Sequence, residues 1–406
     1  MKPLFVLLIM IFSTAAGFGV DEDRVLSGDM SIGKRYLFPS KILDADQRYR
    51  VLLPMSYERN PTAKYPVLYV LDGGHAFATL TYSTMLSHYG FGTKVPEAII
   101  VAIQSNNRFR DYTAVNSAIG YDGKTAPYLR QSGGGETYKA FLKQEFIPHI
   151  EKHYRTNGYR ALLGHSIGGY FVFFDMLSAE PLFKSYLSVD PSLWFGGGHL
   201  IEALPDFSGG ILPSGGKAYV SVALSGLKSD DPDVVSYQRT KLPRVEAVQD
   251  YIKQVNTGFS MKVDLYPDEH HGSVVPISFY EGLRYLFEGY EPPGIEKIAN
   301  DLELVARHFD IYSKMIGVKF IPDYRVVTDA AMTAAGNGML DNATALFELN
   351  VANFPKSIRI LSQLARHYEN RDREEKALTI YKEILLLSPE DEIAQRKIEE
   401  LSRSGQ

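Results

Sequence analysis

Short apolar runs alternate with longer amphipathic runs between about residue 36 and residue 288. Most of the short runs are dense in Val, Ile, Leu and Tyr and are bounded by Gly, Asp, Pro or Ser, as is typical of buried strands. The predicted strands are Arg48 to Leu53, Pro66 to Leu71, Ala98 to Ile103, Arg160 to Leu163, Ser185 to Val189, Ala218 to Leu224 and Met261 to Tyr266.

Helical patterns lie between these strands. They cover Glu136 to His153, Gly168 to Ser178, Leu242 to Val255 and Ile277 to Phe287. Alternation of strands and helices favours an α/β fold with a mostly parallel sheet and helices on both faces. The first runs, Tyr36 to Leu43 and Arg48 to Leu53, are separated by a short Asp-rich gap, which predicts an antiparallel hairpin at the sheet edge.

The pattern changes at residues 289–296, where Gly289, Pro292, Pro293 and Gly294 predict a linker. The rest of the chain, residues 297–406, is almost wholly helical in pattern and repeats at a spacing of 34 residues. The repeated pairs are Ala331 and Ala365, Ala343 and Ala377, Phe347 and Tyr381, and Pro355 and Pro389. This spacing resembles tetratricopeptide repeats and predicts a small all-α domain after an α/β domain at residues 20–288. Two repeats are too few for a free solenoid, so we expect them to pack on the first domain or on a capping helix from Asp301 to Met315.

Composition and charge exclude several classes of site. The chain has 406 residues, with 43 basic and 48 acidic side chains and no cysteine. The mild acidity argues against binding of nucleic-acid phosphates, so no nucleic-acid partner is expected. The lack of cysteine excludes disulfides, thiolate metal sites and cysteine nucleophiles.

The N-terminus carries the pattern of a signal peptide at residues 1–19. One Lys precedes nine apolar residues, Leu4 to Phe12, and small residues follow up to an acidic cluster. The apolar run is too short to span a bilayer of about 30 Å, and no later run of 18 apolar residues exists. We therefore expect an exported protein, periplasmic or secreted, without a transmembrane segment after cleavage. A frayed apolar terminus is the alternative.

The strongest chemical signal is Gly164-His165-Ser166-Ile167-Gly168-Gly169. A G-x-S-x-G motif alone is weak, but here an apolar strand precedes it and an amphipathic helix follows. This strand–turn–helix context predicts a nucleophile elbow with Ser166 at its tip. A plain glycine-rich turn is the alternative.

A serine nucleophile needs a general base, which in this type of sheet should follow the last strand. His270 and His271 both lie in that loop, and His271, adjacent to Gly272 and Ser273, is the preferred base. A metal site built from these histidines with Asp268 and Glu269 is the competing interpretation. Adjacent histidines in an extended loop point in opposite directions, so no metal or other cofactor is expected.

The acid that orients the histidine is expected after the preceding strand, Ala218 to Leu224. Asp230, Asp231 and Asp233 crowd there, and Asp230 is nearest the strand end. The sequence does not choose among them, and a Ser–His dyad without an acid remains open. Backbone donors for an oxyanion are expected from Ile167 and from Gly74 or His75.

Two further residues are candidates for substrate binding. Trp194, the only tryptophan, follows a strand and should lie near the sheet edge where ligands bind in open α/β folds. A substrate-facing wall and simple packing are equally consistent with its position. Arg110 or Arg108 could hold a carboxylate or catecholate group, or instead form a surface salt bridge.

Residues 36–288 resemble the putative-esterase family of α/β-hydrolases, which includes esterase D, trilactone-siderophore esterases, feruloyl esterases and mycolyltransferases. The resemblance is carried by seven blocks in order: Tyr65 to Gly73, Arg110 to Thr113, Phe146 to Glu151, Tyr154 to Thr156, Gly164 to Gly169, Pro191 to Trp194 and His271 to Val274. It implies Ser166 as nucleophile, His271 as base, and Gly74 with Ile167 near the oxyanion. The acid is the least uniform member of the family, and some siderophore esterases work as Ser–His dyads. The helical tail resembles that of a subgroup of exported bacterial esterases.

The leading hypothesis is an exported serine esterase that needs no cofactor and acts on a small-molecule ester. The alternatives are a catalytically silent binding protein and an acyltransferase of the same fold. The ester itself remains open among siderophore lactones, aryl esters and short-chain acyl esters. Residues 297–406 could recruit a protein partner, mediate self-association or only cover the first domain.

Overall fold

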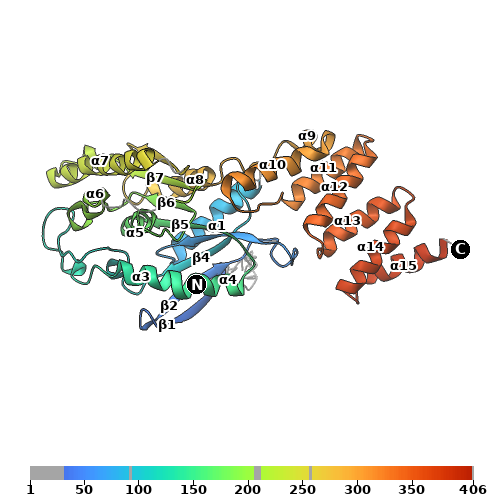
Figure 1. Cartoon of the computed structure of the whole chain (residues 1–406), viewed down its shortest axis with the longest axis horizontal. Coiled ribbons are helices and arrows are strands. Elements are labelled where there is room, and N and C mark those ends of the chain that lie inside the picture. The colour runs from blue at the N-terminus through green and yellow to red at the C-terminus, as the bar shows by residue number, and fades with distance from the viewer. Residues whose placement is uncertain (1–31, 91–93, 205–211, 256–257, 405–406) are drawn as a thin grey trace, which may run out of the picture. The chain divides into compact units, whose positions relative to one another are not determined.

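The computed structural model describes residues 32–90, 94–204, 212–255 and 258–404. Its centre is one eight-stranded sheet with the strand order β1-β2-β4-β3-β5-β6-β7-β8 (Figure 1). The strands are β1 (Lys34–Ser40), β2 (Ala45–Leu52), β3 (Tyr65–Val70), β4 (Ile99–Gln104), β5 (Thr156–His165), β6 (Ser185–Val189), β7 (Lys217–Ala223) and β8 (Ser260–Tyr266). The first two are antiparallel to their neighbours, and the other strands are parallel.

Helices of this α/β region (residues 34–286) cover both faces of the sheet. They are α1 (His75–Gly90), α2 (Arg108–Asp111), α3 (Gly135–Phe141), α4 (Ile147–His153), α5 (Ile167–Met176), α6 (His199–Glu202), α7 (Pro232–Val255) and α8 (Val274–Leu286). Short helical turns are η1 (Pro127–Leu129), η2 (Leu142–Phe146), η3 (Phe195–Gly198) and η5 (Ser225–Lys228).

Two apolar clusters correspond to the two faces of the sheet. Along β3, Val67 and Tyr69 pack into one cluster and Leu68 and Val70 into the other, because successive side chains of a strand point to opposite faces. Helices α3, α4, α5 and α7 contribute to the first cluster, and α1 and α8 contribute to the second. Strands β3, β4, β6 and β7 are buried along almost their whole length, as their continuous apolar sequences predict.

The predicted fold class and the predicted edge hairpin are confirmed. Two long helices differ from the prediction. Helix α1 is not predicted, and helix α7 begins at Pro232, well before the predicted start at Leu242, and passes through Pro243. The additional turns are polar in sequence but contain the buried side chains of Gln238 and Lys241. Burial of these polar groups depends on partners elsewhere in the chain, which the helical pattern does not reveal.

The C-terminal part is all-helical, as predicted. This helical region (residues 295–404) consists of α9 (Ile295–Asn300), α10 (Leu302–Ile316), α11 (Tyr324–Gly336), α12 (Leu340–Asn353), α13 (Ile358–Glu369), α14 (Glu374–Leu387) and α15 (Glu392–Ser404). The 34-residue spacing relates α11 to α13 and α12 to α14. The four repeated alanines are completely buried, which is expected where paired helices approach closely.

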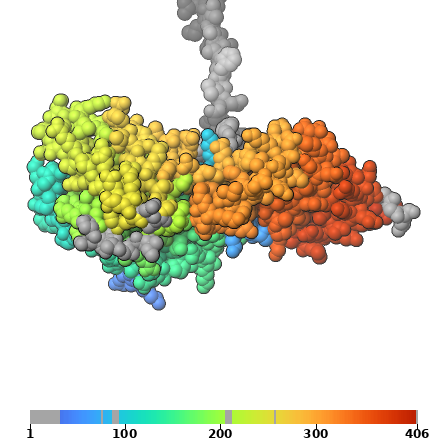
Figure 2. Space-filling view, turned by 45° about the horizontal axis from the view of Figure 1, so that its top comes forward, coloured from blue at the N-terminus to red at the C-terminus, as the bar shows by residue number. Residues whose placement is uncertain are grey.

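The helical region packs directly against the α/β region, and their surfaces are continuous in the space-filling view (Figure 2). Tyr290, the second residue of the predicted linker, is buried and contacts the rings of Phe309 and Tyr312 from α10. Phe320, which follows α10, contacts Tyr159 on β5 with ring centroids 5.8 Å apart. These aromatic contacts make the start of the helical region part of the second apolar cluster.

The predicted signal peptide, residues 1–19, lies outside the described residues. Within the described part of the chain, no helix combines the length and the apolar character needed to cross a bilayer.

Candidate active site

Ser166 lies at a sharp turn between β5 and α5. Its backbone has φ 62° and ψ −118°, a left-handed conformation that non-glycine residues adopt only when the surroundings hold them there. The neighbouring glycines make this turn possible, since a Cβ on Gly164 would lie 2.4 Å from the carbonyl oxygen of Gly168. The turn has the geometry of a nucleophile elbow, with the serine at the carboxyl end of a central strand.

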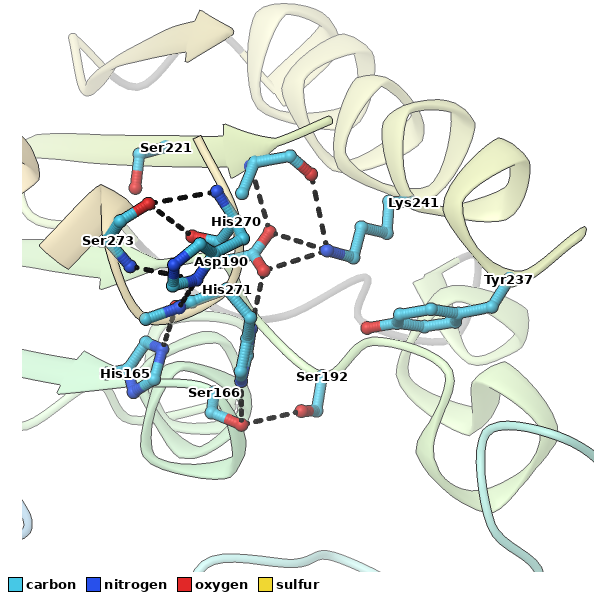
Figure 3. A network of polar contacts seen from close by, with 12 residues as sticks. His165, Ser166, Asp190, Ser192, Ser221, Tyr237, Lys241, His270, His271 and Ser273 are labelled. Carbon is cyan, nitrogen blue, oxygen red and sulfur yellow. Dashed lines mark hydrogen bonds and ion pairs between the residues drawn. The ribbon is translucent and has the colours of Figure 1, made fainter. Parts of the chain in front are cut away.

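His271 is the histidine that the structure brings to Ser166. Its Nε2 lies 2.9 Å from the Oγ of Ser166 (Figure 3). It belongs to the loop between β8 and α8, where the sequence predicts the base. The ring of His270 instead accepts hydrogen bonds from the backbone amides of Gly272 and Ser273 at 3.1 and 3.2 Å, which turns it toward its own loop.

The carboxylate beside His271 belongs to Asp190. This corrects the prediction, which gave Asp230 as the first choice for the acid. The Oδ2 of Asp190 lies 2.6 Å from the Nδ1 of His271. Asp190 directly follows β6, the strand next to β5 in the sheet, so its side chain starts from the same sheet edge as Ser166. Because the Nδ1–H of His271 donates to this carboxylate, Nε2 is free to accept the proton of Ser166.

The acidic cluster predicted for this role lies on the surface. After β7 the chain forms η5 and then the first turn of α7, which leaves Asp230, Asp231 and Asp233 exposed. Asp233 forms an exposed ion pair with Lys124 at 3.1 Å. The end of β7 contributes a different group, the backbone amide of Ala223, which donates to the Oδ1 of Asp190 at 3.0 Å.

Asp190 is completely buried and has a cation beside it. Lys241 of α7 donates to both carboxylate oxygens, at 2.9 and 2.8 Å. Burial alone would raise the pKa of Asp190, but the hydrogen bonds from His271 and Lys241 outweigh it and lower this pKa below its ordinary value. Neither Asp190 nor Lys241 is among the site residues predicted from the sequence. A carboxylate directly after the apolar run Ser185 to Val189 was an available signal for Asp190, whereas no local pattern marks Lys241.

His165, which precedes the serine, packs on His271 with ring centroids 4.4 Å apart. Burial, together with the nearby His271, lowers the pKa of His165 to about 4, so its ring is neutral near pH 7. Its Nε2 donates to the carbonyl oxygen of His271 at 2.8 Å. The neutral His165 ring thus packs against His271 and donates to its carbonyl oxygen without placing a second positive charge beside it.

Two further groups surround the Ser166 hydroxyl. The Oγ of Ser192, on the loop after β6, lies 3.3 Å from the Oγ of Ser166. The amide of Ile167 is the first of α5, and the first four amides of a helix have no intrahelical acceptor. The amide of Gly74, the second predicted oxyanion donor, points to the carbonyl oxygen of Asp72 at 2.6 Å.

The two arginines considered for substrate binding both form ion pairs. Arg108 makes a bidentate pair with Asp72, at 2.9 and 2.8 Å, and Asp72 lies beside the start of α5. The Nε of Arg110 donates to Asp111 at 2.7 Å. Both arginines therefore form salt bridges, which is one of the two interpretations that the sequence allows for them.

Trp194 follows Ser192 by two residues and is half-buried. Its ring lies 6.2 Å from that of Tyr121, which in turn lies 5.2 Å from the ring of Tyr237 on α7. The three rings form an aromatic cluster that joins the loop after β6 to α7. In the described ranges, no group of three or more His, Asp or Glu side chains is arranged to hold a metal ion.

Comparisons with known proteins bear on the family and the fold of this chain. Residues 40–231 match the family described as "Putative esterase". The ferri-bacillibactin esterase BesA of Bacillus subtilis is 29% identical over 161 residues, which cover 36% of this chain and 55% of BesA. The apo-salmochelin esterase of Escherichia coli O6:H1 is 31% identical over 159 residues, which cover 37% of this chain and 49% of that enzyme. The chain thus spans about half the length of the curated relatives it matches.

Among solved structures, an IroE-like serine hydrolase from Shewanella oneidensis is similar, with 27% identity and a TM-score of 0.68. The similarity covers 78% of this chain and 98% of that one. The siderophore hydrolase EstB from Aspergillus nidulans, with 17% identity and a TM-score of 0.53, shares the fold.

Proposed function

We propose that this chain, an α/β-hydrolase of the putative-esterase type, is a serine esterase that cleaves carboxylic esters through an acyl-enzyme on Ser166. One observation carries the proposal, namely the continuous line of contacts from Ser166 Oγ through His271 to Asp190 (Figure 3). A nucleophile, a base and an acid in this order are what a serine needs to attack a carbonyl carbon near neutral pH.

In the first half-reaction, the Oγ of Ser166 forms a bond to the ester carbonyl carbon while its proton passes to Nε2 of His271. The charge of the imidazolium that results is stabilised by Asp190. The tetrahedral intermediate then breaks its bond to the alcohol oxygen, which takes the proton from His271. Water follows the same route in reverse, so that the products are an alcohol and a carboxylic acid and Ser166 is regenerated.

The negative oxygen of the tetrahedral intermediate needs donors fixed in advance. We assign one to the amide of Ile167, at the start of α5, and the second to the amide of Gly74. To serve in this way, Gly74 must exchange its present bond to the carbonyl oxygen of Asp72 for the substrate oxygen. The Ser192 hydroxyl, 3.3 Å from the nucleophile, is placed to donate to the same region.

The substrate site extends from Ser166 toward the aromatic cluster of Tyr121, Trp194 and Tyr237. We assign Trp194 as a wall for the acyl or alcohol part of the ester. Arg110 has a side chain that is 40% exposed and uses its Nε for Asp111, so its terminal nitrogens remain able to bind a carboxylate or catecholate group. BesA and the salmochelin enzyme are named as siderophore esterases. A siderophore lactone is therefore the first substrate class to test, followed by aryl and short-chain esters.

Export and a binding role of the helical region complete the proposal. Export rests on the signal-peptide pattern of residues 1–19, and N-terminal sequencing of the protein recovered from outside the cytoplasm tests it. The C-terminal segment at residues 297–406 is proposed to bind a protein partner or a second copy. Native mass and sedimentation of the full chain distinguish these two.

The test of the proposed function is intact mass after treatment with a fluorophosphonate, on the mature protein and on Ser166→Ala. We expect one adduct on the wild type, located at Ser166, and none on the variant. The Ser166→Ala variant, which forms no adduct, should also fail to hydrolyse every member of an ester panel. A wild type that takes up no adduct at high probe concentration would reject the proposal and favour a binding protein. Acyl transfer to an added alcohol in preference to water would instead identify an acyltransferase.

A further inference from the structure

The residue that the mechanism above does not use is Lys241. Its side chain is only 4% exposed, which is unusual for lysine because burying an ammonium ion is costly unless it is paired. An ammonium group has three donors, and all three find acceptors within 3.3 Å. They are the two carboxylate oxygens of Asp190 and the carbonyl oxygen of Ala223. Asp190 is the anion that pairs with this buried cation.

Asp190 in turn is held from several directions. Its Oδ1 accepts from Lys241 and from the amide of Ala223, and its Oδ2 accepts from Lys241 and from His271 (Figure 3). The carboxylate that orients His271 is thus fixed by one helix, one strand end and the histidine itself. Rotation about its side-chain bonds would break at least two of these hydrogen bonds.

The charge of Lys241 has a second consequence. In a triad without this lysine, the full negative charge of the aspartate would stabilise a protonated histidine. Here the Oδ2 that accepts from His271 also accepts from Lys241, at 2.8 Å, so the negative charge is shared between two cations once His271 takes up a proton. Lys241 and Asp190 are buried, so solvent screens their interaction weakly, whereas the His271 side chain is 46% exposed and is screened more strongly. Lys241 therefore opposes protonation of His271 while it holds Asp190 in place.

The other charged and titratable groups around this network are few. His165 faces His271 from the end of β5, and Tyr237 faces Lys241 from the same helix, with the ammonium 5.0 Å from its ring centroid. His270 and Glu269 precede His271 on its own loop. His165 is neutral near pH 7, as described above, so within this group Lys241 is the cation in direct contact with Asp190.

We propose that Lys241 is a positioning residue of the esterase, which fixes Asp190 and extends the working range of His271 to lower pH. The proposal rests on the proposed function of Ser166, His271 and Asp190. It predicts an effect on the pH dependence of catalysis that a purely structural lysine would not have.

The experiment compares the pH profile of kcat/KM for an aryl ester in the wild type and in Lys241→Met and Lys241→Gln. Loss of the positive charge should move the lower limb of the profile to higher pH by about one pH unit. We also expect a decrease in kcat of about tenfold, because Asp190 loses two donors, with a smaller change in KM. Lys241→Gln keeps a donor without the charge and should fold if the methionine variant does not. Lys241→Arg should restore the limb to within a few tenths of a pH unit.

Lys139→Met is the matched control. Lys139 is also buried and pairs with a buried aspartate, Asp175, but lies on α3 away from Ser166. Its removal should leave the position of the limb unchanged. An unshifted limb in Lys241→Gln, or an equal shift in Lys139→Met, would overturn the proposal. So would an arginine variant that behaves like the glutamine variant.

A measurement without substrate separates this inference from the proposed function. The protonation midpoint of the His271 ring can be followed by NMR in histidine-labelled protein and assigned with His271→Gln. Lys241→Gln should raise this midpoint by about one pH unit, whether or not an ester is hydrolysed. An inactive wild type would reject the proposed function, whereas an unchanged midpoint would reject the role of Lys241.

Discussion

Among the described residues, two lysine–aspartate pairs are almost fully buried, and they hold their carboxylates in opposite ways. Asp190 receives hydrogen bonds on both oxygens, and Lys241 contacts both. Asp175 on α5 receives bonds on Oδ2 alone, from the hydroxyl of Tyr186 at 2.8 Å and the amide of Leu182 at 3.0 Å. Its Oδ1 is 3.6 Å from the Lys139 ammonium, beyond hydrogen-bond distance.

The difference appears in the charge that each site favours. Burial raises the pKa of Asp175 to about 6, because Lys139, Tyr186 and Leu182 compensate only part of the lost hydration. At Asp190 the donors outweigh burial, and the pKa is lowered. Equal burial therefore does not decide the ionisation of a carboxylate. The number and closeness of the donors decide it, and this chain concentrates them on Asp190, beside His271.

The largest expected difference between the two pairs is in activity. Asp190→Asn should lower kcat/KM by about a thousandfold to ten-thousandfold, because an amide cannot hold His271 in the tautomer that accepts the Ser166 proton. Asp175→Asn should change kcat/KM by less than about threefold, since Asp175 is remote from the reacting atoms. Steady-state kinetics with an aryl ester above pH 7 measures both. A comparable loss in the two variants would mean that global stability, and not the histidine contact, governs activity.

The second difference is in stability. Removing one partner from a buried pair typically costs about 3–5 kcal/mol, and we expect Lys241→Met to lie in this range. Lys139→Met should cost about 1–2 kcal/mol, because Asp175 already tends to take up a proton and becomes neutral when its cation is lost. Urea unfolding at pH 7.5 provides the comparison. The reverse order of the two costs would show that the closeness of the donors does not set the strength of these pairs.

A third prediction concerns pH. The pKa of Asp175 is higher in the folded protein, about 6, than its ordinary value of 3.8, so its protonation contributes stability that is complete below about pH 4. That contribution is lost as the pH rises through 6 and amounts to at most about 3 kcal/mol, at 1.36 kcal/mol per pH unit. The unfolding free energy of the wild type, minus that of Asp175→Asn, should therefore fall between pH 4 and pH 7. A constant difference would contradict the raised pKa.

The smallest expected effect concerns the Tyr186 hydroxyl, one of the two groups that donate to Oδ2 of Asp175. Tyr186→Phe removes the hydroxyl that donates to Oδ2 and should cost about 1–2 kcal/mol at pH 7. Tyr69→Phe is the control. Tyr69 is equally buried, and within the described part of the chain its hydroxyl has no hydrogen-bond partner, so its removal should be neutral or slightly stabilising. Equal costs in the two variants would indicate that the loss comes from packing around the tyrosine hydroxyl and not from its hydrogen bond to Asp175.

Most of the sheet can be predicted from the sequence, because buried parallel strands are continuous apolar runs and each run is local. The structure places a strand at every run predicted here. Helix α1 is not predicted, because it contains no Asp, Glu, Lys or Arg to mark a polar face. The early start of α7 is also missed, since its buried lysine resembles a surface residue until Asp190 is placed beside it.

The site divides in the same way into local and long-range parts. The turn at Ser166 follows from glycines within a few residues, and His271 follows from its place after the last strand. The contact of Asp190 with His271 joins residues 81 positions apart, and that of Lys241 with Asp190 joins residues 51 apart. Such contacts depend on which strand ends are neighbours in the sheet. The chain order of the strands does not supply that information, which is why the acid was sought after β7.

Strand β5 has a consequence for how the protein is made. One end leads to Ser166, and near the other end Tyr159 lies against Phe287 and Phe320. Phe320 lies more than 150 residues later in the chain. Strand β5 therefore leaves the ribosome long before Phe320, which covers Tyr159 in the folded protein. A nascent chain that stops near Gly289 would expose the aromatic rings of Tyr159 and Phe287 to water as an apolar surface.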